Sequence, residues 1–191
     1  MTEVNFGSDG DFSDTAMILK INTNLANELG NLCQRTLSMV FKNCDGAVPQ
    51  EVGTLTEEDE ALLASARGLY AKTAGHVSVQ AIQKYASEMI GIVWEANKYI
   101  DTMAPWALRK ENPERMATVL YVIMEVLRHV AILYQPIIPT SANKILDLLA
   151  VPEDERTFAH LDDSYAIKPG APISKPTGIF PRIETPELVE T

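Results

Sequence analysis

Two segments about seventy residues apart carry the side chains of this chain that are best suited to chemistry. The first, N-x-x-N-x-L-G-N-L-x-x-R at residues 24–35, places Asn27, Asn31 and Arg35 at i, i+4 and i+8, which is one line along an α-helix. The second, W-x-x-N-x-Y-I-x-x-x-A-P-W, ends with Pro105 and Trp106. Amide and guanidinium donors read base edges, and an indole stacks on an unpaired base. The two segments together therefore indicate a surface that reads unpaired bases.

Each of these side chains also has a purely structural interpretation. Arg35, on a polar helix edge, suits an ion pair with a neighbouring helix, and Asn27 suits a hydrogen bond to one. A tryptophan beside a turn, such as Trp106, is more often a half-buried anchor than a base platform. The residues alone leave both interpretations open.

Other residues of the second segment are expected to be structural. Trp94 lies near the apolar stripe of its helix, so we expect it to pack in the core. Asn97 and Tyr99 are expected to hold the Ala-Pro-Trp turn by hydrogen bonds.

Basic residues near the two segments are candidate contacts to RNA phosphates: Lys42, Lys98, Arg109 and Lys110. Over residues 97–110, three basic residues against one aspartate give a local charge of +2. The whole chain carries −10, which disfavours phosphate binding. The acidic residues gather in linkers and ends, such as residues 51–60, so the objection weakens.

Composition indicates an ordinary globular chain. With 191 residues, 46% hydrophobic and 22% charged, it is long enough for one well-packed domain and an appendage. No apolar run approaches the roughly 20 residues of a membrane-spanning helix, so we expect no membrane partner. Cys33 and Cys44 lack C-x-x-C spacing, which disfavours a metal site and predicts reduced thiols in an intracellular protein.

Hydrophobic periodicity predicts an antiparallel bundle of four or five helices. The first begins at Ser13 or Asp14 and runs to about residue 43, and a capping-box pattern of Thr56 and Asp59 opens the second, to about residue 73. A third is predicted from Ser78 to residue 104. The fourth opens at residue 113, and residues 145–149 carry a short fifth.

The predicted organisation has three parts. Residues 1–14 form a connecting peptide, residues 15–150 form the helical domain, and residues 151–191 form an arm. Prolines and glycines from residue 152 onward rule out continued helix, so residues 166–183 suit an extended arm or a small hairpin.

Four stretches, in order along the chain, resemble the C-terminal part of the methionyl-tRNA synthetases, which are class I aminoacyl-tRNA synthetases. They are E-V-N-F-G-S-D-G-D-F-S at residues 3–13, N-L-A-N-E-L-G-N-L-x-x-R, N-K-Y-I-D-x-x-A-P-W at 97–106, and G-A-P-I-S-K-P-T-G-I-F-P-R-I-E at 170–184. The resemblance implies the anticodon-binding helix bundle of class I synthetases, with an arm that folds back toward a catalytic domain.

The resemblance also implies roles for the singled-out residues. Trp106 would stack on the first base of the CAU anticodon of tRNA(Met), with Pro105 fixing its approach. Asn31 and Arg35 would reach base edges and backbone, and Asn27 is a further candidate for the same surface.

The family's catalytic signatures, an H-x-G-H-type motif and a K-M-S-K-S loop, do not occur in this sequence. We therefore expect no cofactor here, with ATP and methionine bound by a catalytic domain that is itself a partner of this one. The expected location is the cytoplasm, with a mitochondrial or plastid matrix as the alternative.

Two rival interpretations remain at this point. One is a helical protein-interaction module that binds no RNA. The other is the tRNA-binding domain of a related synthetase, for leucine, isoleucine, valine or cysteine, since these share the bundle architecture.

Overall fold

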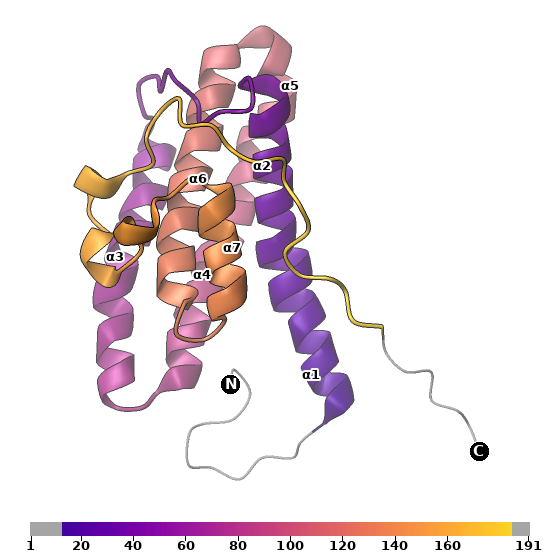
Figure 1. Cartoon of the computed structure of the whole chain (residues 1–191), viewed down its shortest axis with the longest axis vertical. Helices are drawn as coiled ribbons and strands as arrows, with labels where there is room; N and C mark the ends of the chain where they lie inside the picture. The colour runs from indigo at the N-terminus through magenta and orange to yellow at the C-terminus, as the bar shows by residue number, and fades with distance from the viewer. Residues whose placement is uncertain (1–12, 185–191) are drawn as a thin grey trace.

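The computed structural model describes residues 13–184 of the chain. Residues 1–12, which hold most of the predicted connecting peptide, and residues 185–191 lie outside that range. Within it, long helices pack side by side as a bundle and an extended arm follows them (Figure 1). The predicted fold class, an all-α bundle with a C-terminal arm, is confirmed.

The first helix is continuous but changes type along its length. α1 (Asp14–Lys20), η1 (Ile21–Gly30) and α2 (Asn31–Asn43) follow one another without a break, and η1 is a π-helix. Such stretches are rare and occur frequently at functional sites. The Ser13 hydroxyl caps the start by accepting a hydrogen bond from the Ala16 amide, as predicted.

α3 (Glu57–Ser78) and α4 (Ile82–Met103) form an antiparallel pair. α3 begins in the predicted capping box. The predicted boundary between them is wrong, because α3 continues past residue 73 and Ser78 ends α3 instead of opening α4. The chain reverses at Gln80, whose φ of 57° is left-handed. Glutamine does not predict a turn, because glycine or asparagine is the usual residue in the left-handed conformation.

α4 ends at Ala104, and a short helix that the sequence did not predict follows it. This helix, α5 (Pro105–Glu111), begins with Pro105 at its first position, where the missing amide hydrogen costs nothing. Asn112 then caps the next helix with its side chain, as the Asn-Pro-Glu sequence predicts.

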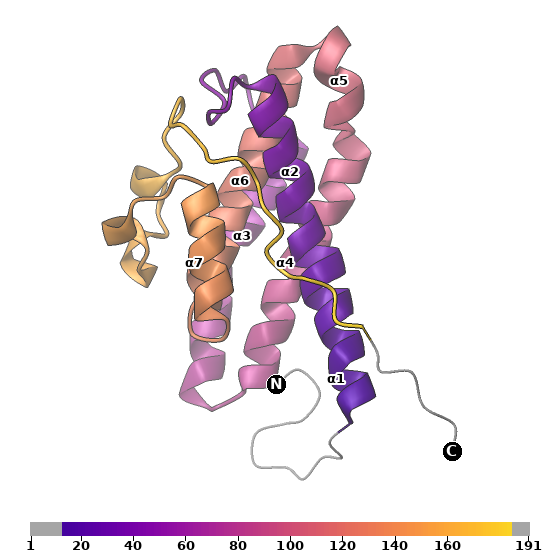
Figure 2. The same ribbon diagram turned by 45° about the vertical axis from the view of Figure 1, so that its right-hand side comes forward.

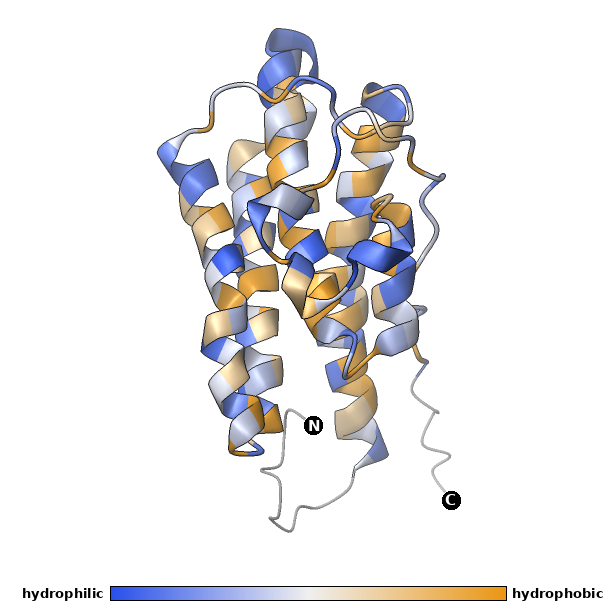
Figure 3. Cartoon of the chain, turned by 60° about the vertical axis from the view of Figure 1, so that its left-hand side comes forward, coloured by the Kyte–Doolittle hydropathy of each residue, from blue (hydrophilic) through white to orange (hydrophobic). Residues whose placement is uncertain are grey.

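α6 (Pro113–Tyr134) is the central helix, and α7 (Pro139–Leu148) packs against it. α6 is long and apolar enough to cross a membrane, but 89% of its most apolar stretch is buried inside the bundle. Figure 3 shows the hydrophobic residues of the helices gathered on the surfaces that face one another. The apolar character of α6 is therefore accounted for by the core.

The arm begins with three short 3-10 turns, η2 (Glu153–Glu155), η3 (Phe158–His160) and η4 (Asp163–Tyr165). It then runs extended across the bundle and down along the first helix (Figures 1 and 2). Of the two predicted alternatives, an extended arm or a small hairpin, the extended arm is observed, with one isolated bridge from Pro172 to Ala47.

The arm is fastened to the first helix at its far end. The Asn22 side chain donates to the Ile183 carbonyl at 2.8 Å and accepts from the Ile183 amide at 2.9 Å. A Cβ added at Gly30 would lie 3.2 Å from the Phe180 ring and 3.0 Å from the Leu25 carbonyl oxygen. Glycine therefore permits the close approach of the arm to η1.

Candidate nucleic-acid interface

The fold brings Arg35 of α2 and Trp106 of α5 together at one end of the bundle. The Arg35 guanidinium carbon lies 5.2 Å from the centroid of the indole, which is a cation–π arrangement. Arg35 also donates to the Asp101 carboxylate at 2.6 Å. Trp106 nevertheless remains 49% exposed. A guanidinium and a half-open indole thus form one composite surface.

The turn between α4 and α5 sets the position of the indole. Ala104 adopts a left-handed backbone, φ 43° and ψ 57°, and is at once the C-cap of α4 and the N-cap of α5. A non-glycine residue there costs roughly 1–2 kcal/mol. Pro105 is buried, so it fixes the start of α5 and leaves the next side chain, Trp106, at the surface.

The two predicted asparagines lie along the first helix. Asn31 is exposed one turn before Arg35, and Asn27 is exposed within η1. Because Asn31 lies four residues before Arg35 on the same helix, its exposed amide extends the composite surface of Trp106 and Arg35. Asn27 lies one turn further from the indole.

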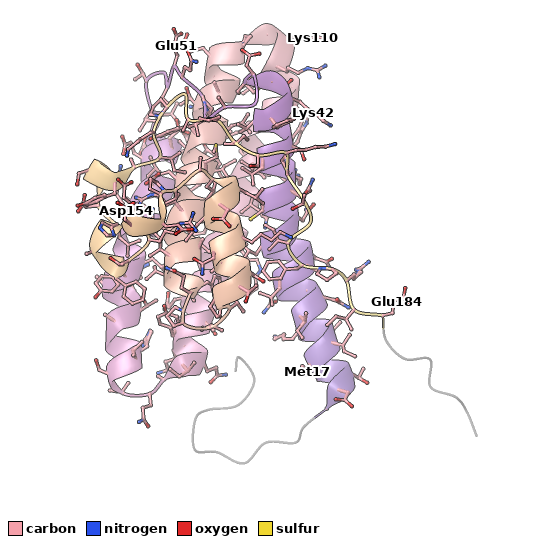
Figure 4. The ribbon with its side chains drawn as sticks, viewed as in Figure 1. Met17, Lys42, Glu51, Lys110, Asp154 and Glu184 are labelled. Atoms are coloured by element: carbon pink, nitrogen blue, oxygen red, sulfur yellow. The ribbon has the colours of Figure 1, made fainter. Side chains whose placement is uncertain are left out.

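The four candidate phosphate contacts are all exposed: Lys42, Lys98, Arg109 and Lys110. Lys42, near the end of α2, and Lys110, near the end of α5, lie at the same end of the molecule in Figure 4, opposite Met17 and Glu184. Lys98 lies on α4, about one turn before Asp101. Basic side chains thus lie on α2, α4 and α5, the helices that meet around the indole, and Glu51 lies at the same end of the molecule as Lys42 and Lys110.

Asn97 and Tyr99 do not hold the Ala-Pro-Trp turn, so that prediction is wrong. The Asn97 amide donates to the Glu28 carboxylate at 2.9 Å and ties α4 to η1. The Tyr99 hydroxyl donates to the Asp59 carboxylate at 2.5 Å and ties α4 to α3. Both side chains therefore link α4 to its neighbouring helices.

Asp59 is the centre of a buried network that joins α3, α4 and α6. It accepts from Arg115 of α6 at 2.8 Å as well as from Tyr99. Burial raises the pKa of Asp59, but the hydrogen bonds from Arg115 and Tyr99 outweigh it and hold that pKa below its ordinary value. Burial, together with the neighbouring Asp59 carboxylate, raises the pKa of Tyr99.

Trp94 is 52% exposed, so the prediction that it packs in the core is wrong. Helical geometry puts it on the same side of α4 as Lys98 and Asp101, at i, i+4 and i+7. Tyr85, Met89 and Val93 fill the core side of α4 instead.

Within residues 13–184, no group of three or more His, Cys, Asp or Glu side chains is placed to hold a metal ion. An apolar pocket of about 400 Å³ lies between α3, α4 and the end of α6, with Phe158 of the arm at its edge. Its lining includes Tyr70, Val77 and Tyr85 but no acidic or basic side chain.

Comparison with known protein families matches residues 48–190 to the anticodon binding domain of methionyl tRNA ligase. The chain belongs to this family. Trp106 lies within the matched residues, whereas Asn31 and Arg35 precede them. Membership of the methionyl-tRNA ligase family rules out the rival assignment to the leucine, isoleucine, valine or cysteine enzymes.

Curated relatives extend the match to the first helix. The chain is 48% identical to the methionine–tRNA ligase of Rhizobium meliloti (strain 1021) over 187 residues, which is 98% of this chain and 36% of that protein. It is 46% identical to the methionine–tRNA ligase of Mycobacterium tuberculosis (strain ATCC 25618 / H37Rv) over 194 residues, which is 100% of this chain and 37% of that protein. The chain thus spans little more than a third of these methionyl-tRNA ligases.

Solved structures agree. The free state of Mycobacterium tuberculosis methionyl-tRNA synthetase superposes with a TM-score of 0.92 and 46% identity, covering 96% of this chain and 37% of that one. The same enzyme bound by methionyl-adenylate gives a TM-score of 0.90 over 94% of this chain and 36% of that one. The bundle is therefore that of a methionyl-tRNA synthetase anticodon-binding domain.

Proposed function

We propose that this chain recognises the CAU anticodon of tRNA(Met), as one part of an enzyme that joins methionine to its tRNA with ATP. The observation that carries the proposal is the Arg35 guanidinium 5.2 Å from the centre of the half-exposed Trp106 indole. Membership of a methionyl tRNA ligase family supports a tRNA as the partner. The Arg35–Trp106 pair can bind an unpaired base of that tRNA.

The mechanism divides between stacking and edge recognition. The first anticodon base stacks on Trp106, which contributes roughly 1–3 kcal/mol. Asn31 and Arg35 bond base edges or backbone, and a wrong base leaves their donors unpaired. Asn27 extends the same surface, and Pro105 holds the indole in place.

Phosphate contacts from Lys42, Lys98, Arg109 and Lys110 add affinity that falls with salt. ATP and methionine bind outside this chain, in a catalytic domain toward which the arm leads. We assign the protein to the cytoplasm, or alternatively to an organelle matrix. The free thiols of Cys33 and Cys44 suit these reducing compartments.

Binding of an anticodon stem-loop to the Trp106→Ala variant tests the proposal. We expect its affinity for a CAU loop to be roughly 5- to 150-fold lower than that of the parent chain, which is the loss of one base stack. Tyr70→Ala is the matched control, because Tyr70 is also a partly exposed aromatic side chain but lies on α3.

Equal affinity of the parent and the Trp106→Ala variant would contradict the proposal. It would favour the rival interpretation, a helical module whose polar surface binds a protein partner. The Tyr70→Ala control is expected to bind the loop as the parent does.

A further inference from the structure

Trp94 is an exposed indole for which neither the core nor the proposed anticodon contacts account. Large hydrophobic side chains that are exposed elsewhere in residues 13–184 lie near the chain ends, at the α3–α4 turn, or around the apolar pocket: Met17, Leu19, Ile183, Val79, Tyr70, Val77 and Phe158. Trp94 and Trp106 belong to none of these places. Trp94 lies on the side of α4 that carries Asp101, and the ion-pair partner of Asp101, Arg35, contacts the Trp106 ring of α5.

The register of α4 places Trp94 beside the first helix. Asn97 bonds Glu28 and Asp101 bonds Arg35, so this side of α4 borders η1 and α2, as Figure 2 shows. At 100° per residue, Trp94 lies within about 20° of Asp101 around the helix axis. Trp94 therefore lies on the same side of α4, two turns before the ion pair.

The spacing between the two indoles suits separate bases of one strand. Ten residues of helix separate Trp94 from Ala104, which corresponds to a rise of about 15 Å. That is several steps of about 3.4 Å between stacked bases. With that length of helix between Trp94 and the turn that carries Trp106, the two rings suit different bases, a few nucleotides apart in one loop.

The side chains between the two indoles also suit RNA. Lys98 lies exposed between Trp94 and Asp101 on α4, and Asn27 and Asn31 lie exposed on the neighbouring helix. An aromatic ring, a cation and amide groups on neighbouring helices are the elements of a single-strand binding surface. The surface is continuous with the one proposed for the anticodon.

We propose that Trp94 is a second stacking platform, which holds an unpaired nucleotide of the tRNA anticodon loop a few positions from the base on Trp106. The inference rests on the proposed function, since it requires that the loop lies across this face. Trp94 adds affinity and fixes the path of the loop, as Trp106 does for the first anticodon base, while Asn31 and Arg35 discriminate the anticodon.

Intrinsic fluorescence tests the inference, because Trp94 and Trp106 are the two tryptophans of the chain. In Trp106→Phe the emission comes from Trp94, and in Trp94→Phe it comes from Trp106. Phenylalanine keeps a stacking ring, so both variants retain RNA binding. Each is titrated to saturation with a CAU anticodon stem-loop and with versions in which one loop nucleotide at a time is abasic.

We expect the intact loop to quench both emitters. One abasic position removes the Trp94 quench, and a different position removes the Trp106 quench. Trp94→Leu is expected to weaken stem-loop binding roughly 5- to 150-fold, the range for one base stack. Tyr70→Leu is the control for loss of an exposed aromatic, with no expected change in binding.

The outcomes separate the two proposals. Quenching of Trp106 by saturating RNA with unchanged emission from Trp94, and full affinity in Trp94→Leu, overturns the second platform and leaves the proposed function standing. Failure of the loop to quench either tryptophan overturns both. An unchanged circular dichroism spectrum of Trp94→Leu shows that a loss of binding is not a loss of fold.

Discussion

Arg35 takes part in two interactions at once, an ion pair with Asp101 and a cation–π contact with Trp106. The ion pair is exposed, with 62% of the Asp101 side chain open to solvent, so it contributes little to stability. Its effect is geometric, because it keeps a planar cation beside the indole. The structural and recognition interpretations of Arg35 are therefore compatible.

We predict that Arg35→Lys weakens binding to a CAU stem-loop about tenfold while stability changes little. Lysine keeps the charge but loses the planar, forked donor set. An exposed ion pair is worth roughly 0.2–1 kcal/mol, so Tm should fall by no more than about 4 °C. Binding titration and thermal unfolding measure the two effects.

Arg67→Lys is the control for Arg35→Lys, since Arg67 pairs with Asp163 on the far side of the bundle. Its RNA binding should match that of the parent. A large fall in Tm of Arg35→Lys without loss of RNA affinity would mean that Arg35 is structural.

At the scale of elements, the arm is held by polar side chains buried in α6. Arg128 is fully buried and donates to the Glu125 carboxylate and to the His160 carbonyl of the arm. His129 lies with Nε2 2.8 Å from the Leu161 carbonyl, and the Ile167 amide donates to Glu125. Burial of these groups is tolerated because the arm supplies their partners.

The pH dependence of the free energy of unfolding should reveal the burial of His129 against the arm. Burial, assisted by the charge of Arg128, lowers the pKa of His129, although the Glu125 carboxylate acts in the opposite direction. The folded protein therefore keeps the ring neutral, and the unfolded chain takes up a proton below its ordinary pKa of about 6.5. The contribution of His129 to the free energy of unfolding is therefore full above that pH and is lost as the pH falls below it.

We predict that His129→Gln removes this decline between pH 7.5 and pH 5.5. Urea unfolding at several pH values measures it, with His76→Gln as the control that should retain the decline. An equal decline in the parent and in His129→Gln would show that another group is responsible.

The positions of most helices follow from the sequence. Periodicity and capping residues predict the helices from Ser13, from Thr56 and from Asn112, and the ordered motifs predict that Arg35 and Trp106 meet. The exposure of Trp94 and the partners of Asn97 do not follow, because they depend on which neighbour occupies each side of α4.

The short helix α5 and the α3–α4 turn were missed for a different reason. Both depend on left-handed backbone at Ala104 and Gln80, residues whose types do not favour it. The buried Glu125–Arg128–His129 group was also missed, since the broad apolar stripe of α6 does not show that a distant arm would satisfy polar side chains there.

At the scale of the whole molecule, the net charge of −10 opposes RNA binding. Lys42 and Lys110 lie at the same end of the molecule as Glu51 (Figure 4), so both signs of charge occur there. Long-range repulsion of RNA is screened beyond roughly 8–10 Å at physiological salt, so we expect the lysines nearest the RNA to dominate the electrostatics of binding. Binding should accordingly be weak at high salt.

We predict that Lys110→Gln lowers the slope of log affinity against log salt concentration by about 0.7–0.9, the value for one phosphate contact. Lys72→Gln, an exposed lysine on α3, should leave the slope unchanged. Equal slopes for the parent and Lys110→Gln would show that Lys110 makes no phosphate contact.

The measurement that tests the central claim most directly is competition for this chain between stem-loops that differ only in the anticodon. A labelled CAU loop is displaced by unlabelled CAU and by loops with one anticodon base changed. We predict that each changed loop competes roughly 5- to 150-fold less well, because a wrong base covers the Asn31 or Arg35 donors without accepting a hydrogen bond from them. Equal competition by all loops would contradict anticodon recognition by this chain.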